Sequence, residues 1–195
     1  MKKFIITSIL LTFFMVTIPV MAQEETLLKN GIYHTGGHGG PVSKLTSFNG
    51  ELGLMTGGRG VWTINHAFSI GGGGYGLSTD IDAPMSDRNM NVQYGGVILE
   101  YNAFPNRLIH FSANTMIGAG EVNYRYIDNY YDDRYGSDKF SVVEPGLNLE
   151  LNVVKFFHIG FGVSYRFVDG IELKGLRNNN MSGISANVIL KFGDF

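Results

Sequence analysis

The chain has 195 residues, contains no cysteine and carries a formal net charge of −2. Without cysteine the fold can use neither disulfides nor a lipidated thiol. Without a basic patch we expect no nucleic-acid partner, and no motif calls for a cofactor.

The first 22 residues have the pattern of a secretory signal peptide. Two lysines precede an apolar run that ends at Met21, and the small residue Ala22 precedes the expected cleavage point before Gln23. The run is also long enough for a membrane anchor. Pro19 near its end and the acidic residues just beyond it favour cleavage. No second apolar run could form a transmembrane helix, so a membrane could be crossed only by strands.

Beyond the leader, side chains alternate between apolar and polar with the period of two that is typical of strands. In "FFHIGFGVSYRFV" (156–168), the residues Phe157, Ile159 and Phe161 share one face, whereas His158 and Gly160 share the other. The pattern predicts strands near 42–48, 51–64, 67–78, 91–103, 108–125, 138–153, 156–168 and 182–193.

The connections between these strands alternate in length. The turns at 65–66, 104–107 and 154–155 are tight, whereas "TDIDAPMSDRNM", "IDNYYDDRYGSD" and "DGIELKGLRNNN" are long and charged. Asn49-Gly50 is a strong hairpin signal between the first two strands. Eight strands would therefore bring both ends of the chain to the end that has the tight turns.

The strand number, the alternating connections and the final "SANVILKFGDF" resemble small bacterial outer-membrane β-barrels of the OmpA/OmpX type. The stretch "GGRGVWTIN" also looks like uncharacterised barrel proteins of Bacteroidetes. The resemblance implies an all-β fold, a closed up-and-down transmembrane barrel of eight antiparallel strands, in contact with outer-membrane lipid. It further implies that Phe192 and Phe195 form the signal read by the barrel assembly machinery.

On this reading the chain has a signal peptide at 1–22, a periplasmic N-terminal segment at 23–41 and an outer-membrane barrel at 42–195. The alternative is a soluble secreted barrel or sandwich with the same alternation inverted, so that the apolar face points inward.

Charged residues on the polar faces are expected inside the barrel. An eight-stranded barrel has an interior just wide enough for side chains, and buried charges are costly unless they pair. The predicted charge network consists of Glu51, Arg59, Glu100, Glu144, Glu150, Arg166 and Lys191. Glycines, including the run in "FSIGGGGYGL" (68–77), would make room for these long side chains and permit the bends that close a small barrel. A lumen filled in this way argues against an open pore.

The histidines are further candidates for binding or catalysis. His34 and His38 are four positions apart in a glycine-rich segment that lacks further ligands, so we expect incidental tail histidines. His66, His110 and His158 lie near the tight turns, which is the wrong end for a lipid A-modifying enzyme.

The long loops are the remaining candidates. The stretch "NYYDDRYG" has a composition common in loops that bind proteins or glycans, and its candidate residues are Tyr130, Tyr131, Asp132, Asp133, Arg134 and Tyr135. Asp80, Asp82 and Asp87 could bind calcium, but solvated charge is expected there because no EF-hand spacing is present. We therefore expect a structural or interaction-mediating barrel without catalytic activity. A lipid A-modifying barrel enzyme and a small-solute channel are the alternatives.

Overall fold

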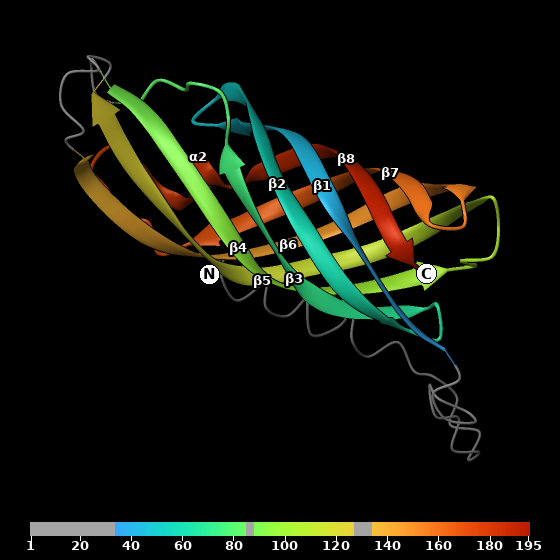
Figure 1. Ribbon diagram of the computed structural model, residues 1–195. Helices are drawn as coiled ribbons and strands as arrows, with labels where there is room; N and C mark the ends of the chain where they lie inside the picture. Colours follow the sequence, from blue (N-terminus) through green and yellow to red (C-terminus); the bar gives the residue numbers. More distant parts are fainter. Residues whose placement is uncertain (1–33, 85–87, 127–133) are drawn as a thin grey trace, which may run out of the picture. The chain divides into compact units, whose positions relative to one another are not determined.

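The computed structural model describes residues 34–84, 88–126 and 134–195, which form a closed antiparallel β-barrel (Figure 1). Each strand pairs with the next one in sequence, and β8 returns to pair with β1. The strands are β1 (Thr35–Phe48), β2 (Glu51–Ile64), β3 (Phe68–Leu77), β4 (Arg88–Ala103), β5 (Ile109–Tyr126), β6 (Arg134–Val154), β7 (Phe157–Asp169) and β8 (Gly183–Asp194). The predicted closed, up-and-down, eight-stranded fold is confirmed.

The largest difference from the predicted boundaries is the start of β1, which begins at Thr35 rather than Val42. Residues 35–41 pair with residues 58–64 of β2, so they belong to the barrel and not to the expected N-terminal segment. The segment "TGGHGGP" has no apolar alternation, and its strand character comes from the neighbour with which it pairs. The expected signal peptide and the cleavage before Gln23 lie outside the described residues.

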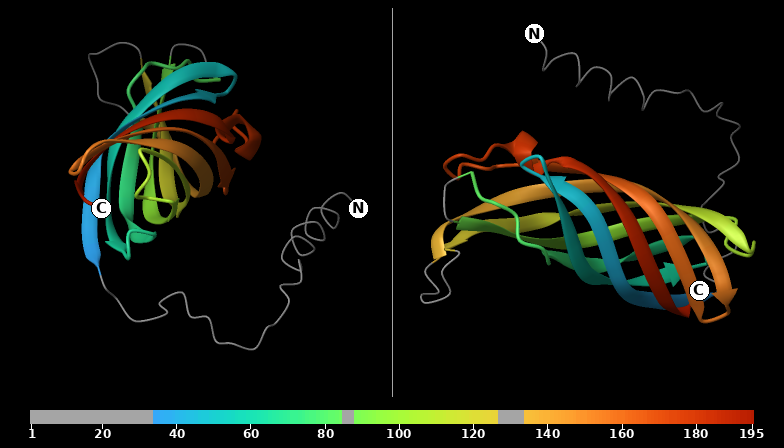
Figure 2. Two further views of the ribbon diagram at one scale, coloured as in Figure 1. Left: turned by 90° about the vertical axis from the view of Figure 1, so that its right-hand side faces the viewer. Right: turned by 90° about the horizontal axis from the view of Figure 1, so that it is seen from above.

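The connections sort into two ends, as the sequence predicts (Figure 2). The short-turn end carries residues 65–67, 104–108 and 155–156, together with the beginning of β1 and the end of β8. The long-loop end carries residues 78–84 and 170–182 and the Asn49-Gly50 turn, in which both residues have positive φ. The helix α2 (Asn178–Met181) lies in the last of these loops. Among the described residues no helix is long and apolar enough to cross a membrane.

The outer wall of the barrel is apolar. Along β7, the side chains of Phe161, Val163 and Phe167 are exposed, whereas Ser164 and Arg166 between them are buried. The same alternation holds in β5, β6 and β8. The apolar rows therefore face outward and the polar rows inward, which is the reverse of what a soluble barrel requires.

Inside the long-loop end lies an apolar cluster. It combines inward residues of the strands, such as Phe48, Met55 and Tyr124, with the loop residues Ile81 and Leu176, and all five are buried. The polar interior therefore occupies the rest of the barrel, toward the short turns.

The glycines of "FSIGGGGYGL" lie alternately on the inner and outer faces of β3. A Cβ on the inward Gly71 would collide with the main-chain oxygen of Gly60 on β2, so this position requires glycine. The outward Gly72 and Gly74 have more room, with the nearest atoms at 3.4 and 3.7 Å from a Cβ. Gly72 and Gly74 therefore do not line the lumen, contrary to the expectation that the whole run makes room for long side chains. At Gly71, the close approach of neighbouring strands accounts for glycine.

Candidate functional site

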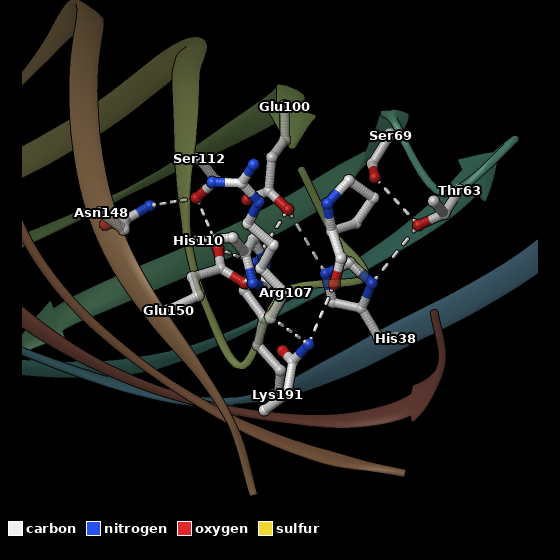
Figure 3. A network of polar contacts seen from close by, with 12 residues as sticks. His38, Thr63, Ser69, Glu100, Arg107, His110, Ser112, Asn148, Glu150 and Lys191 are labelled. Carbon is white, nitrogen blue, oxygen red and sulfur yellow. Dashed lines mark hydrogen bonds and ion pairs between the residues drawn. The ribbon is translucent and has the colours of Figure 1, made fainter. Parts of the chain in front are cut away.

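The interior of the short-turn half holds a cluster of buried charges centred on Glu100 of β4 (Figure 3). Its carboxylate accepts hydrogen bonds from the guanidinium of Arg59 on β2 and from Lys191 Nζ of β8, the latter at 2.9 Å. His38 Nε2 of β1 lies 3.5 Å from the same carboxylate. The acid is thus met by side chains from three other strands.

Glu150 of β6 is the second acid of this cluster. Lys191 Nζ lies 2.5 Å from Glu150 Oε1, so one lysine bridges Glu150 and Glu100. Ser112 donates a hydrogen bond to the same oxygen, and His110 Nε2 lies 3.4 Å from Oε2. Every one of these side chains is buried. A buried acid or base is tolerated only when it is paired in this manner.

A separate buried pair joins Lys44 of β1 to Glu144 of β6. Lys44 Nζ lies 2.9 Å from both carboxylate oxygens. Tyr94 donates to Glu144 at 2.8 Å and Ser164 at 2.6 Å. The ammonium also sits 3.6 Å from the ring centroid of Tyr75. Glu144 therefore has three donors, and Lys44 has both an ion pair and a cation–π contact.

Five of the seven predicted network residues lie in these two clusters: Arg59, Glu100, Glu150 and Lys191 in the first, and Glu144 in the second. The prediction is wrong for Glu51, whose side chain is exposed at the start of β2. Glu51 accepts a hydrogen bond from the Asp82 main chain at 3.2 Å. Glu51 follows the inward-facing alternation of β2, but at this end of the strand the side chain already lies outside the barrel interior.

Arg166 is buried as predicted, yet it forms no ion pair with any described residue. Its guanidinium donates to the main-chain oxygens of Met181 at 2.7 Å and Ser47 at 3.1 Å. It also lies 4.0 Å from the ring centroid of Phe48. Arg166 stands beside α2 at the long-loop end, so one carbonyl of the loop and one of β1 take the place of the acid expected from the sequence.

Sequence reasoning missed Lys44 and His38. Lys44 follows the alternation Val42, Lys44, Thr46, and counting inward positions back from the Asn49-Gly50 turn would have found it. The sequence predicts a tail at His38, because glycine and proline obscure the strand around it. It is 4% exposed, and its Nδ1 lies 3.3 Å from Thr63 Oγ1.

The histidines gather at the short-turn end around Phe195. The Phe195 ring stacks on His158 at a centroid distance of 3.6 Å and on His38 at 4.8 Å. His66 contacts the main-chain oxygen of Phe195. Phe192, in contrast, faces outward and stacks on Phe157 at 4.8 Å. Of the two residues of the expected assembly signal, Phe192 thus faces outward from β8, whereas Phe195 follows the strand and stacks on buried histidines. Their role in assembly stays a prediction.

The structure does not assemble the other candidate residues into a site among the described residues. No group of three or more His, Asp or Glu residues in the described ranges is placed to hold a metal ion. Asp82 forms an isolated bridge with Asn89, and Asp87 lies outside the described residues. Tyr130, Tyr131, Asp132 and Asp133 also lie outside them, and Arg134 and Tyr135 begin β6.

Between the two charge clusters lies a cavity of about 20 Å³, lined by Lys44, Arg59, Asn114, Glu144 and Ser164 among others. That is room for roughly one water molecule. The arrangement can hold charges in fixed positions, but this cavity offers no space for a substrate.

Comparison with known proteins identifies the fold. No protein-family model matches the chain, and no curated protein sequence does. Among solved structures, the chain is similar to Neisserial surface protein A (NspA), with a TM-score of 0.54 and 10% identity, covering 82% of this chain and 96% of NspA. It is also similar to the N-terminal β-barrel domain of Pseudomonas aeruginosa OprF, with a TM-score of 0.50, 10% identity and coverage of 82% and 96%. The chain thus shares its fold with eight-stranded outer-membrane barrels.

Proposed function

We propose that this protein is an integral outer-membrane β-barrel with a closed, side-chain-filled lumen and no catalytic activity. Its role is structural, or it mediates surface contacts with a protein or a glycan through the long loops. The observation that carries the proposal is the division between an apolar outer wall and a buried, paired set of charges. An apolar belt outside and a polar interior are what a bilayer demands of a strand-built protein.

Membrane fractionation tests the location. We expect the protein in the outer-membrane fraction, with a folded band that shifts in gel mobility on heating. N-terminal sequencing of the protein in that fraction tests the leader: a first residue Gln23 would support cleavage of residues 1–22. Recovery of soluble protein from the periplasm without detergent would refute the membrane assignment.

The channel alternative predicts a continuous water-filled lumen. The ion pairs that join non-neighbouring strands, the small central cavity and the apolar cluster at the long-loop end all argue against it. In planar bilayers we therefore expect no steady ion conductance. Large and stable single-channel currents from the unmodified protein would establish the channel function instead.

The enzyme alternative requires reactive groups near the outer leaflet. The buried histidines His38, His110 and His158 lie toward the short turns, and His38 and His110 stand beside buried acids. Lipid A should therefore emerge unmodified from cells that overproduce the protein, as judged by mass spectrometry.

A separate experiment tests surface recognition by the long loops. Cells that carry the protein are applied to a protein or glycan array, and the Tyr130→Ala, Tyr131→Ala double variant is compared with the unmodified protein. Loss of binding in the double variant would support surface recognition.

A further inference from the structure

A groove lies on the outer wall of the barrel, over β3, β4 and β5 (Figure 1). It has a volume of about 460 Å³, and we call it the wall groove. Most of its lining residues belong to the outward rows of the strands: Ile64, Phe68, Ile70, Leu99, Tyr101, Ala113 and Thr115. The others, Ser69, Glu100 and Asn114, belong to the inward rows and so contribute their main chain.

The strand register explains why the wall is hollow here. Two cross-strand rows run through the groove, and each goes from long side chains on β3 and β4 to a short one on β5. The rows are Phe68–Tyr101–Ala113 and Ile70–Leu99–Thr115. The rings of Phe68 and Tyr101 contact each other, with their centroids 4.9 Å apart. Because main-chain ladders hold both rows, the groove is preformed, which lowers the cost of filling it.

The chemistry of the groove favours an apolar occupant. Ile70, Leu99 and Tyr101 are each about half exposed, at 47%, 48% and 47%. No outward side chain of the lining is charged, and its only polar groups are the hydroxyls of Tyr101 and Thr115. A hydrocarbon chain in the groove would touch wall atoms on more than one side, and each contact adds dispersion energy. On a flat part of the wall the same chain would touch protein on one side only.

A second copy of the barrel fits the groove less well than a flexible chain. Bulky outward side chains that could enter it, such as Phe161, Val163 and Phe167, stand on β7, which is another part of the wall. Two copies would then meet through unlike surfaces, and such a head-to-tail contact does not form a closed pair. A lipid chain needs no matching ridge.

We propose that the wall groove holds one acyl chain of a phospholipid from the leaflet at the short-turn end. Phe68 begins β3 directly after the turn at 65–67, so one end of the groove lies near the headgroups of that leaflet. The inference rests on the proposed membrane location. It adds that one lipid stays bound, whereas the lipids around the rest of the wall exchange freely.

Trp62 provides the readout, because it is the only tryptophan in the chain. Its side chain is 49% exposed on the outer wall, and it pairs with Ile70, which lines the groove. The whole barrel is placed in mixed micelles of detergent and dibrominated phosphatidylcholine, whose bromine atoms quench nearby tryptophan. It is then diluted into an excess of micelles with unbrominated phosphatidylcholine. We expect fluorescence to recover in a fast phase, from the surrounding lipid, and a slow phase, from the lipid in the groove.

Native mass spectrometry gives the stoichiometry and variants locate the site. The barrel purified in detergent should carry one phospholipid. Ala113→Leu fills the groove and should remove both the slow phase and this adduct, and Thr115→Leu should act in the same way. Ala186→Leu is the matched control, since Ala186 is an outward alanine on β8 between Leu45 and Val163, and it should keep both signals. Heat-modifiable gel mobility shows that each variant folds.

The outcomes separate this inference from the proposed function. A single fast phase in the unmodified protein, equal behaviour of Ala113→Leu and Ala186→Leu, or an adduct with the mass of a second barrel would overturn the acyl-chain site and leave the membrane location intact. If brominated lipid did not quench Trp62 at all, the outer wall would not contact lipid, and the proposed function would fail together with the inference.

Discussion

Single residues stabilise the interior of this barrel through ion pairs that cross the lumen. Lys44 and Glu144 come from β1 and β6, which are not neighbours in the sheet, and Glu100 and Lys191 face each other from β4 and β8. Each pair therefore links strands that the backbone ladder does not connect. Removing one partner leaves a charge without compensation in a place that water does not easily reach.

The Lys44–Glu144 pair provides the first prediction. Glu144→Gln should lower the free energy of unfolding by about 3–5 kcal/mol, because Lys44 loses the one acid that pairs with it among the described residues. Lys44→Met combined with Glu144→Gln should cost less than the sum of the two single changes, which is the sign of direct coupling. Urea unfolding in lipid vesicles measures both.

Glu51→Gln is the matched control for that experiment, since Glu51 is an exposed glutamate at the start of β2. The free energy of unfolding of the Glu51→Gln variant should equal that of the unmodified protein. Additive effects of the Lys44 and Glu144 changes would show that the pair does not act as a unit.

The glycine run yields the second prediction. Gly71→Ala should destabilise the barrel by about 1–3 kcal/mol, the usual cost of overpacking, because its Cβ would meet the main chain of β2. Gly60→Ala is the control, since a Cβ there has no atom within 4 Å, and its stability should be unchanged or slightly raised. Equal stabilities of the two variants in urea would contradict the close approach of β2 and β3.

Within each strand, one alternating pattern determines both the apolar outer surface of the barrel and its polar interior. Phe161 is 53% exposed on the outer face of β7, and its neighbour Gly162 faces inward. A charge on the outer row would have to enter the hydrocarbon layer, whereas the inner row already holds charges. The two rows of one strand should therefore respond to substitution in opposite ways.

The third prediction follows for the outer row. Phe161→Arg should lower the free energy of unfolding in vesicles by about 2–4 kcal/mol, the cost of arginine at the lipid-facing midplane. Phe161→Leu keeps the surface apolar and should cost much less. If the two variants were equally stable in vesicles, the outer wall would not face lipid.

The early start of β1 gives the fourth prediction. Gly37 pairs with Trp62 on one side and Asp194 on the other. Proline at this position removes a main-chain donor from the ladder. Gly37→Pro should destabilise the barrel by about 1–3 kcal/mol, because a main-chain acceptor of the ladder is left without its donor.

Gly37→Ala keeps the donor, and its Cβ would lie 3.3 Å from the main-chain oxygen of Val61, a tight contact, so it should cost less than proline. Urea unfolding compares the two variants. If proline were tolerated as well as alanine, residues 35–41 would behave as the tail that their composition suggests.

At the scale of the whole molecule, closure of the sheet sets what the protein can do. Pairing of β1 with β8 leaves no edge strand, so main-chain hydrogen bonds need no water and the wall is compatible with a bilayer. The same closure brings inward residues from all sides into one narrow space. The charged clusters fill the middle and the apolar cluster fills the long-loop end.

The strand number, the two kinds of connection and the face on which most side chains lie can all be predicted from the amino-acid sequence. These features are local: a period of two can be read within one strand, and Asn49-Gly50 marks a turn by its own chemistry. That is why Arg59, Glu100, Glu144, Glu150 and Lys191 could be assigned to the interior before any partner was known.

Which charges pair, where β1 begins and what Arg166 contacts depend instead on the folded barrel. The pairs Lys44–Glu144 and Lys191–Glu100 join strands on opposite sides of the lumen, so they depend on the register and tilt of the whole barrel. Arg166 meets the Met181 carbonyl because the loop that carries α2 folds over it. Residues 35–41 become a strand because β2 and β8 offer them partners on both sides, and no pattern within seven residues that are mostly glycine could reveal those partners.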